Sequence, residues 1–234
     1  MDDGSTDGTS DWLTSQTEII KISHRNHGVA ASRNRGLERA TGEWIALLDS
    51  DDLWLPKKLE TQLNFLKKNP EIRICQTEEI WERNGVRVNP KEKHKKYSGW
   101  IFEHCIPLCI ISPSAVMIHR DIFKEVGSFD ESFPVCEDYE LWLRVALHYS
   151  VVTLSEPLII KRGGHEDQLS KKWGQDYHRI RALQKILKDP KLAPHQRELV
   201  LKDIERRTQI LKKGASKRGV ESPFYSIVDS PPLE

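Results

Sequence analysis

The sequence lacks any apolar run long enough to cross a bilayer, which takes about 18 or more residues. The longest candidate, residues 105–116, is interrupted by Pro107 and Pro113. The N-terminus is acidic and polar, whereas a secretory signal has basic residues followed by an apolar stretch. These absences predict a cytoplasmic protein with no membrane span and no signal peptide.

Cysteine is also scarce, with four residues in a chain of 234. Their spacing matches no zinc-ribbon pattern, and so few cysteines in so long a chain do not indicate a disulfide framework. Basic stretches interleaved with aromatic side chains, which would indicate a nucleic-acid surface, are absent as well. We therefore expect reduced thiols and no nucleic-acid partner.

Charge is unevenly distributed, although the net charge is only +1. Residues 1–170 contain 21 Lys and Arg against 27 Asp and Glu, whereas residues 171–220 contain 15 against 5. The remaining residues are rich in Ser and Pro, a composition typical of disorder. We expect a main domain over residues 1–170, a basic helical extension over 171–219 and a disordered tail over 220–234.

The basic extension allows two interpretations. It can form a helical hairpin that packs on the main domain and turns a charged face to solvent. Alternatively, residues 171–218 can be attracted to an anionic membrane surface, which would place the protein peripherally at the inner face of the membrane, near a lipid-linked acceptor.

Strand-like apolar runs alternate with amphipathic helical patterns along the main domain. This alternation predicts an α/β fold with a mixed, mostly parallel sheet flanked by helices. Asn84-Gly85 predicts a hairpin over residues 80–88, and residues 171–213 predict two helices separated at Asp189-Pro190. The predicted strands are residues 18–23, 43–48, 72–77, 115–119 and 151–154, and the predicted helices are 29–40, 56–68, 120–126 and 138–148.

An acidic cluster, Asp49-Ser50-Asp51-Asp52, directly follows the apolar run of residues 43–48. Ligands of open α/β sheets bind at the carboxyl ends of the strands. Three crowded carboxylates repel one another, and Mg²⁺ or Mn²⁺ would relieve the repulsion and also contact substrate phosphates. The alternative is an acidic turn that caps the next helix, although a cap needs only one carboxylate.

Two other segments can contact a nucleotide. Residues 2–9 (DDGSTDGT) offer carboxylates to a base or ribose and backbone N–H groups to phosphate, or else form an ordinary turn. In residues 26–36 (NHGVAASRNRG), small side chains permit close packing, and Arg33 and Asn34 can reach a phosphate or a base. The alternative is a solvated, Arg-rich helix.

The last two candidates lie further along the chain. Glu137 and Asp138 open a predicted helix, where the helix dipole stabilises carboxylates and a base could take a proton from an acceptor hydroxyl. His165 follows two glycines and could fold over the site as a metal ligand or phosphate contact. A lone histidine is more often a surface residue.

Taken together, these segments resemble the family 2 glycosyltransferases, which have the GT-A fold, a Rossmann-like α/β architecture. The resemblance covers residues 2–170 and rests on DDGSTDGT, NHGVAASRNRG, LLDSDD at 47–52 and the run from Glu137 to Arg144. It implies inverting transfer of a sugar, by default from a UDP-sugar, to a saccharide or lipid-linked acceptor in cell-surface polysaccharide or glycan synthesis.

The resemblance also implies roles for individual residues. A nucleotide-sugar donor would contact two acidic residues at the start of the chain, the helix around residue 33 and the first aspartate of a DxD motif. A divalent cation, Mn²⁺ or Mg²⁺, would bind the same motif, with Asp51 as the most direct ligand and His165 on a loop. Asp138 would be the general base and Glu137 its partner. The donor contacts are Asp2, Asp3, Arg33, Asn34 and Asp49, and the metal ligands are Asp49, Asp51 and His165.

One departure from the family pattern affects the expected activity. Family members begin with a strand, a loop, a helix and a second strand that leads into the DDGS segment, whereas Met1 stands here where that second strand would end. We therefore expect the first β-α-β portion to be missing, together with one wall of the uridine pocket. The alternatives are a non-catalytic remnant and a nucleotidyltransferase on a related fold.

Overall fold

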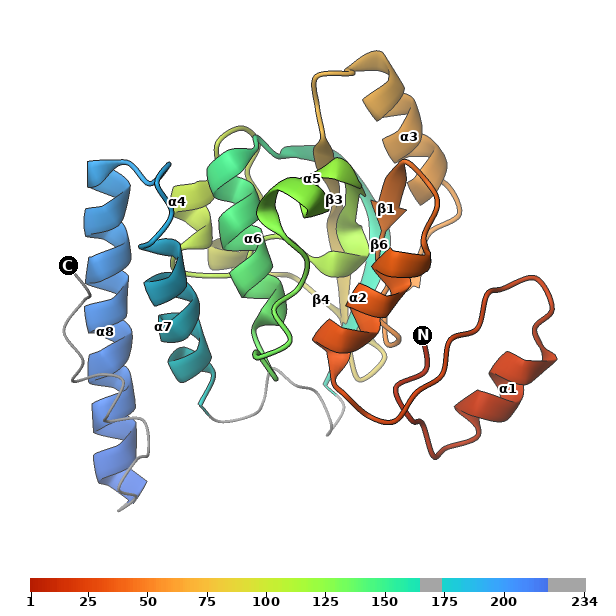
Figure 1. Cartoon of the computed structure of the whole chain (residues 1–234), viewed down its shortest axis with the longest axis horizontal. Helices are drawn as coiled ribbons and strands as arrows, with labels where there is room; N and C mark the ends of the chain where they lie inside the picture. Colours follow the sequence, from red (N-terminus) through yellow and green to blue (C-terminus); the bar gives the residue numbers. More distant parts are fainter. Residues whose placement is uncertain (165–173, 219–234) are drawn as a thin grey trace.

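The computed structural model describes residues 1–164 and 174–218. A six-stranded sheet lies at the centre of these residues, and helices cover it (Figure 1). The strand order is β1-β5-β3-β6-β2, and β4 pairs with β3 outside this path. The strands are β1 (Trp44–Ala46), β2 (Leu53–Trp54), β3 (Ile74–Arg83), β4 (Val86–Val88), β5 (Val116–His119) and β6 (Val152–Gly163).

The mixed α/β architecture predicted from the sequence is confirmed, but fewer neighbouring strands are parallel than expected. β3 and β6 pair in parallel, whereas β5 pairs antiparallel with both β1 and β3. β1, β3 and β6 therefore run in one direction, as the alternation predicts. β5 lies between β1 and β3 in the opposite direction, so β1 and β3 are not neighbours, and β3 and β6 form the parallel pair.

The predicted strand at residues 18–23 is wrong. Only Ser23 takes part in pairing, through an isolated parallel bridge to Asp2, and the side chain of Ile20 is 81% exposed. A strand gains its stability from cross-strand neighbours and from packing on one face. Among the described residues, this segment has such a neighbour only at Asp2.

The predicted hairpin is confirmed. The strands β3 and β4 meet at Asn84-Gly85, and both of these residues have positive φ, 50° and 76°. Two successive positive φ values match the twist of the flanking strands, which is why Asn-Gly is favoured there.

Helices cover both faces of the sheet. The helices α2 (Val29–Arg39), α5 (Asp121–Val126) and α6 (Glu137–His148) share the larger apolar core with one face, which includes Ile74 and Ile118. The helix α3 (Lys58–Lys68) covers the opposite face, where Leu66 packs with Cys75 and Met117. The other helical segments are α1 (Thr9–Ser15), η1 (Glu92–His94), α4 (Phe102–Cys105) and η2 (Pro113–Ala115).

The two helices predicted for the basic extension are confirmed as α7 (Gln175–Ile186) and α8 (Pro194–Arg218). α7 packs against α6, and α8 packs against α7, so the three helices form successive layers beside the sheet (Figure 1). Leu183, Ile186 and Val200 belong to the larger core. The predicted boundary at residue 170 and the predicted tail over 220–234 lie outside the described residues.

The sequence predicted no membrane span and reduced cysteines. No helix in residues 1–164 and 174–218 is long and apolar enough to span a membrane. Cys75, Cys105, Cys109 and Cys136 are free thiols.

Lys58 on α3 is fully buried. It forms no ion pair with any residue in the part of the chain that the structure describes. Its amine lies 4.4 Å from the centre of the Trp54 ring and 3.4 Å from the carbonyl oxygen of Val116. Burial lowers the pKa of Lys58 to about 8. A buried ammonium without a carboxylate partner costs stability at neutral pH.

We expect Lys58→Met to raise the free energy of unfolding at pH 7 by about 1–3 kcal/mol. Because the pKa of Lys58 is lower in the folded state, the cost is fully present below about pH 8 and is relieved as the pH rises toward the unfolded-state value. Urea denaturation at pH 7 and pH 10 checks this, with the exposed Lys57→Met as the control. A loss of stability in Lys58→Met at pH 7 would contradict it.

Candidate active site

Arg33, in the first half of α2, joins two of the predicted motifs. Its Nη2 donates to Asp49 Oδ1 at 2.6 Å, and its Nη1 donates to Glu137 Oε1 at 2.7 Å. The Arg33 side chain is 12% exposed, and its guanidinium lies 5.1 Å from the centre of the Phe129 ring. Burial acts against the charged form, but the carboxylates of Asp49 and Glu137 outweigh it and raise the pKa of Arg33.

Glu137 and Asp138 form the first turn of α6, where the helix dipole favours negative charge. Burial and the neighbouring Asp138 carboxylate raise the pKa of Glu137 to about 7, although Arg33 opposes this. Asp138 is half-buried, and its Oδ2 lies 3.6 Å from the thiol of Cys109. The two adjacent carboxylates therefore have different surroundings, which is the arrangement that separates acid and base roles.

The acidic cluster after β1 does not act as a single set of ligands. Asp52 is 5% exposed, and its Oδ1 accepts the backbone N–H of Arg162 at 3.0 Å. Burial raises the pKa of Asp52 to about 6. Asp52 therefore ties the turn to β6, which corrects the argument that three crowded carboxylates share a cation. Asp49, held by Arg33, and the half-buried Asp51 are the remaining carboxylates of the cluster.

The donor set fits a metal ion only in part. No group of three or more His, Cys, Asp or Glu side chains in residues 1–164 and 174–218 is placed to hold a metal. Mg²⁺ usually binds through one or two carboxylates plus substrate phosphates and does not require an all-protein cage. Asp49 and Asp51 suit that shared arrangement. The predicted third ligand, His165, lies outside the described residues.

The two acidic residues at the start of the chain hold backbone groups. Asp2 is buried, and its Oδ1 accepts the N–H of Ser5 at 3.0 Å, a bond that lowers the pKa of Asp2. The two oxygens of Asp3 accept the N–H groups of His27 and Gly28 at 2.8 and 2.9 Å. Asp3 therefore fixes the entry to α2, and the predicted contacts with a base or ribose stay predictions.

Asn34 lies in a different environment from the one expected. Its Nδ2 donates to the carbonyl oxygen of Phe129 and to Glu131, both at 2.9 Å, and its Oδ1 accepts the N–H of Phe129 at 3.0 Å. The side chain is buried. These bonds tie α2 to the loop before α6, so a nucleotide contact would require Asn34 to break them.

Three residues of the site carry no sequence signal of their own. The hydroxyl of Ser114 accepts the N–H of Asp49 at 3.1 Å and holds the turn after β1. Lys161 on β6 lies close enough to interact electrostatically with Asp52 and Asp138. Cys109, noted from the sequence only as a cysteine, contacts Asp138. These partners are distant in sequence, and no local pattern predicts them.

Comparison with known proteins identifies the family. Residues 1–127 match the family model described as glycosyl transferase family 2. That span exceeds half of the chain, so the chain belongs to this family, which favours the transferase over the nucleotidyltransferase alternative. It is 33% identical over 180 residues to an uncharacterised glycosyltransferase of Rickettsia conorii, and 28% identical over 171 residues to the amylovoran biosynthesis glycosyltransferase AmsE of Erwinia amylovora.

The chain spans only part of the length of these relatives. The aligned parts cover 73% of this chain and 27% of the Rickettsia conorii protein, and 71% of this chain and 62% of AmsE. The structure of S. aureus TarS in complex with UDP-GlcNAc matches 88% of this chain and 61% of that one, with a TM-score of 0.69 and 18% identity. The match to TarS supports the GT-A fold.

Replacement of Asn34 distinguishes a structural role from a ligand contact. We expect Asn34→Ala to lower the free energy of unfolding by about 1–3 kcal/mol, because it removes buried hydrogen bonds and leaves backbone groups of Phe129 without partners. The affinity for UDP should be unchanged. Urea denaturation and calorimetric titration with UDP measure the two effects, and the exposed Arg39→Ala is the control. Unchanged stability with lost UDP affinity would restore the ligand role.

Proposed function

We propose that the chain binds a nucleotide-diphosphate sugar, by default a UDP-sugar, and transfers the sugar to an acceptor hydroxyl with inversion. The observation that carries this proposal is the Arg33 bridge, which brings the turn after β1 and the first turn of α6 into one site. Family membership supports the reaction class. The name of the relative AmsE, an amylovoran biosynthesis glycosyltransferase, supports a role in polysaccharide or glycan synthesis.

The proposed chemistry assigns the proton transfer to Asp138. Its carboxylate accepts the proton of the acceptor hydroxyl as the oxygen forms a bond to the anomeric carbon, and the bond to the diphosphate breaks on the opposite side. General-base assistance of this kind is worth about 10²–10⁴-fold in rate. Glu137 supports the site indirectly by holding Arg33, and Arg33 holds Asp49 in turn.

A divalent cation, Mn²⁺ or Mg²⁺, completes the proposal. Asp51 and Asp49 would hold it together with the diphosphate of the donor, and when bound it would offset the charge of the leaving group. Asp49, Glu137 and Asp138 act electrostatically on Arg33, and Lys161 adds a second positive charge near Asp138. The support for a cation therefore comes from the turn after β1, where Asp49 and Asp51 lie. The membrane contact considered for residues 171–218 is not needed for this chemistry and stays a prediction.

The first test replaces the proposed base. We expect Asp138→Asn to retain the native affinity for UDP and to lose about 10²–10⁴-fold in transfer rate, because the amide cannot accept the proton. UDP release from a panel of UDP-sugars with mixed saccharide acceptors measures the rate, and calorimetry measures UDP binding. Asp121→Asn, the same change at the start of α5, is the control.

Native turnover by Asp138→Asn would rule out this base. If the native chain binds UDP but liberates no UDP from any of the UDP-sugars, the non-catalytic alternative is favoured instead.

The second test concerns the cation. We expect UDP to bind more tightly with Mn²⁺ than with EDTA, and Asp51→Asn to abolish that difference because it removes a ligand shared with the diphosphate. Asp52→Asn is the matched comparison, since Asp52 holds the backbone of Arg162 and should alter stability while leaving the Mn²⁺ dependence intact. Equal UDP affinity in Mn²⁺ and EDTA would contradict the metal assignment.

A further inference from the structure

We propose that Arg207 on α8 is a positioning residue for Asp138, so that the basic C-terminal helices are a working part of the active site. This inference rests on the proposed role of Asp138 as general base. The side chain of Arg207 contacts both α7 and the loop beside the base, residues 106–111.

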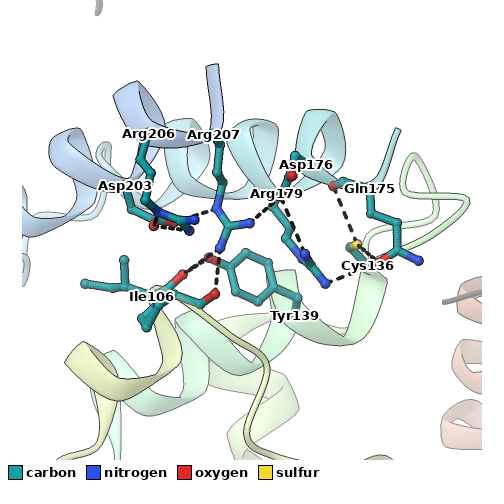
Figure 2. A network of polar contacts seen from close by, with 10 residues as sticks. Ile106, Cys136, Tyr139, Gln175, Asp176, Arg179, Asp203, Arg206 and Arg207 are labelled. Carbon is teal, nitrogen blue, oxygen red and sulfur yellow. Dashed lines mark hydrogen bonds and ion pairs between the residues drawn. The ribbon is translucent and has the colours of Figure 1, made fainter. Parts of the chain in front are cut away.

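Arg207 is a buried centre of polar contacts. Only 2% of its side chain is exposed, although it belongs to a helix with many solvated basic residues. Its Nε donates to Asp203 on the same helix at 2.5 Å, and its Nη1 donates to Asp176 on α7. Figure 2 shows the guanidinium between these two carboxylates, facing the chain at Ile106. Two carboxylate partners and further acceptors are what a buried guanidinium requires.

The guanidinium also reaches the loop that precedes β5. Nη2 of Arg207 donates to the carbonyl oxygen of Pro107 at 2.7 Å and lies 3.4 Å from that of Ile106. The Ile106 carbonyl also accepts the hydroxyl of Tyr139 at 2.5 Å, and the Tyr139 ring centre lies 6.0 Å from the guanidinium. Tyr139 is buried and directly follows Asp138 in the first turn of α6.

The same loop contacts the proposed base directly. Two residues beyond Pro107, the thiol of Cys109 lies 3.6 Å from Oδ2 of Asp138 and 3.3 Å from the carbonyl oxygen of Ile111. Arg207 therefore acts on Asp138 by two routes, through Tyr139 on the helix and through Cys109 on the loop.

The start of α7 contacts the residue that precedes the first turn of α6. Cys136, the residue before α6, has a positive φ of 63°, which is uncommon for a residue other than glycine. Its thiol lies 3.9 Å from the backbone oxygen of Gln175, the first residue of α7. The C-terminal helices thus contact the chain on both sides of Glu137 and Asp138.

The test compares Arg207→Lys with Arg206→Lys. Lysine keeps the charge but cannot span two carboxylates and two carbonyls. Arg206 also bonds to Asp203, but its side chain is 51% exposed and makes none of the loop contacts described for Arg207. We expect Arg207→Lys to lower kcat by about 10–100-fold with KM for the donor unchanged, and Arg206→Lys to change neither.

A double-mutant cycle separates positioning from a general loss of structure. In the Asp138→Asn background, Arg207→Lys should cause no further loss of kcat, because both changes remove the same contribution. Equal losses in both backgrounds, or a rise in KM without a fall in kcat, would overturn the proposal. Native turnover by Asp138→Asn would instead overturn the assignment of the base, whatever Arg207→Lys does.

Amide hydrogen exchange gives a readout that does not depend on turnover. Arg207→Lys should speed exchange at residues 106–111 and 137–140 while α2 stays as protected as in the native chain. Unchanged exchange in both segments would overturn the proposal. If Arg207→Lys fails to fold, the same exchange measurement on Tyr139→Phe tests the proposal, because this change removes only the hydroxyl bonded to Ile106. Faster exchange at residues 106–111 supports the proposal, and native exchange overturns it.

Discussion

The double ion pair of Arg33 is the interaction on which the rest of the site depends. One guanidinium on α2 holds Asp49, in the turn after β1, and Glu137, at the start of α6. The charge of Arg33 is largely buried, with the buried Glu137 on one side and the half-buried Asp49 on the other, and removing either carboxylate would leave part of that charge uncompensated. The strand end that would face a diphosphate and the helix start that would face an acceptor are therefore fixed relative to each other.

The sequence predicted the helices, the hairpin and the acidic turn, because each of these depends on a local pattern of residues. Amphipathic spacing located α2, α3 and α6, Asn84-Gly85 located the hairpin, and the acidic residues after β1 located one side of the site. The pairing of distant segments could not be predicted: the sequence indicated Arg33 as a ligand contact, but Glu137, with which it pairs, lies 104 residues away. The antiparallel insertion of β5 between β1 and β3 is likewise a property of the whole sheet.

Composition also misled in two instructive places. The cluster of acidic residues suggested three equivalent ligands, yet Asp52 is drawn into the protein by the backbone of Arg162. The apolar character of residues 18–23 suggested a strand, yet a strand requires a neighbour, and Ile20 lies in solvent. In the basic extension, Arg206 and Arg207 are adjacent, but the helical turn places one in solvent and the other in the core.

The site therefore consists of three layers that support one another: the strand end at Asp49, the helix start at Asp138, and the C-terminal helices behind it. A crystal structure of the chain with UDP and Mn²⁺ tests this account most directly. The account predicts an ion between Asp51 and the diphosphate, with Arg33 still bonded to Glu137 and Asp138 on the acceptor side, across the position of the donor sugar from the diphosphate. A nucleotide bound away from the turn after β1, or Arg33 released from Glu137, would contradict it.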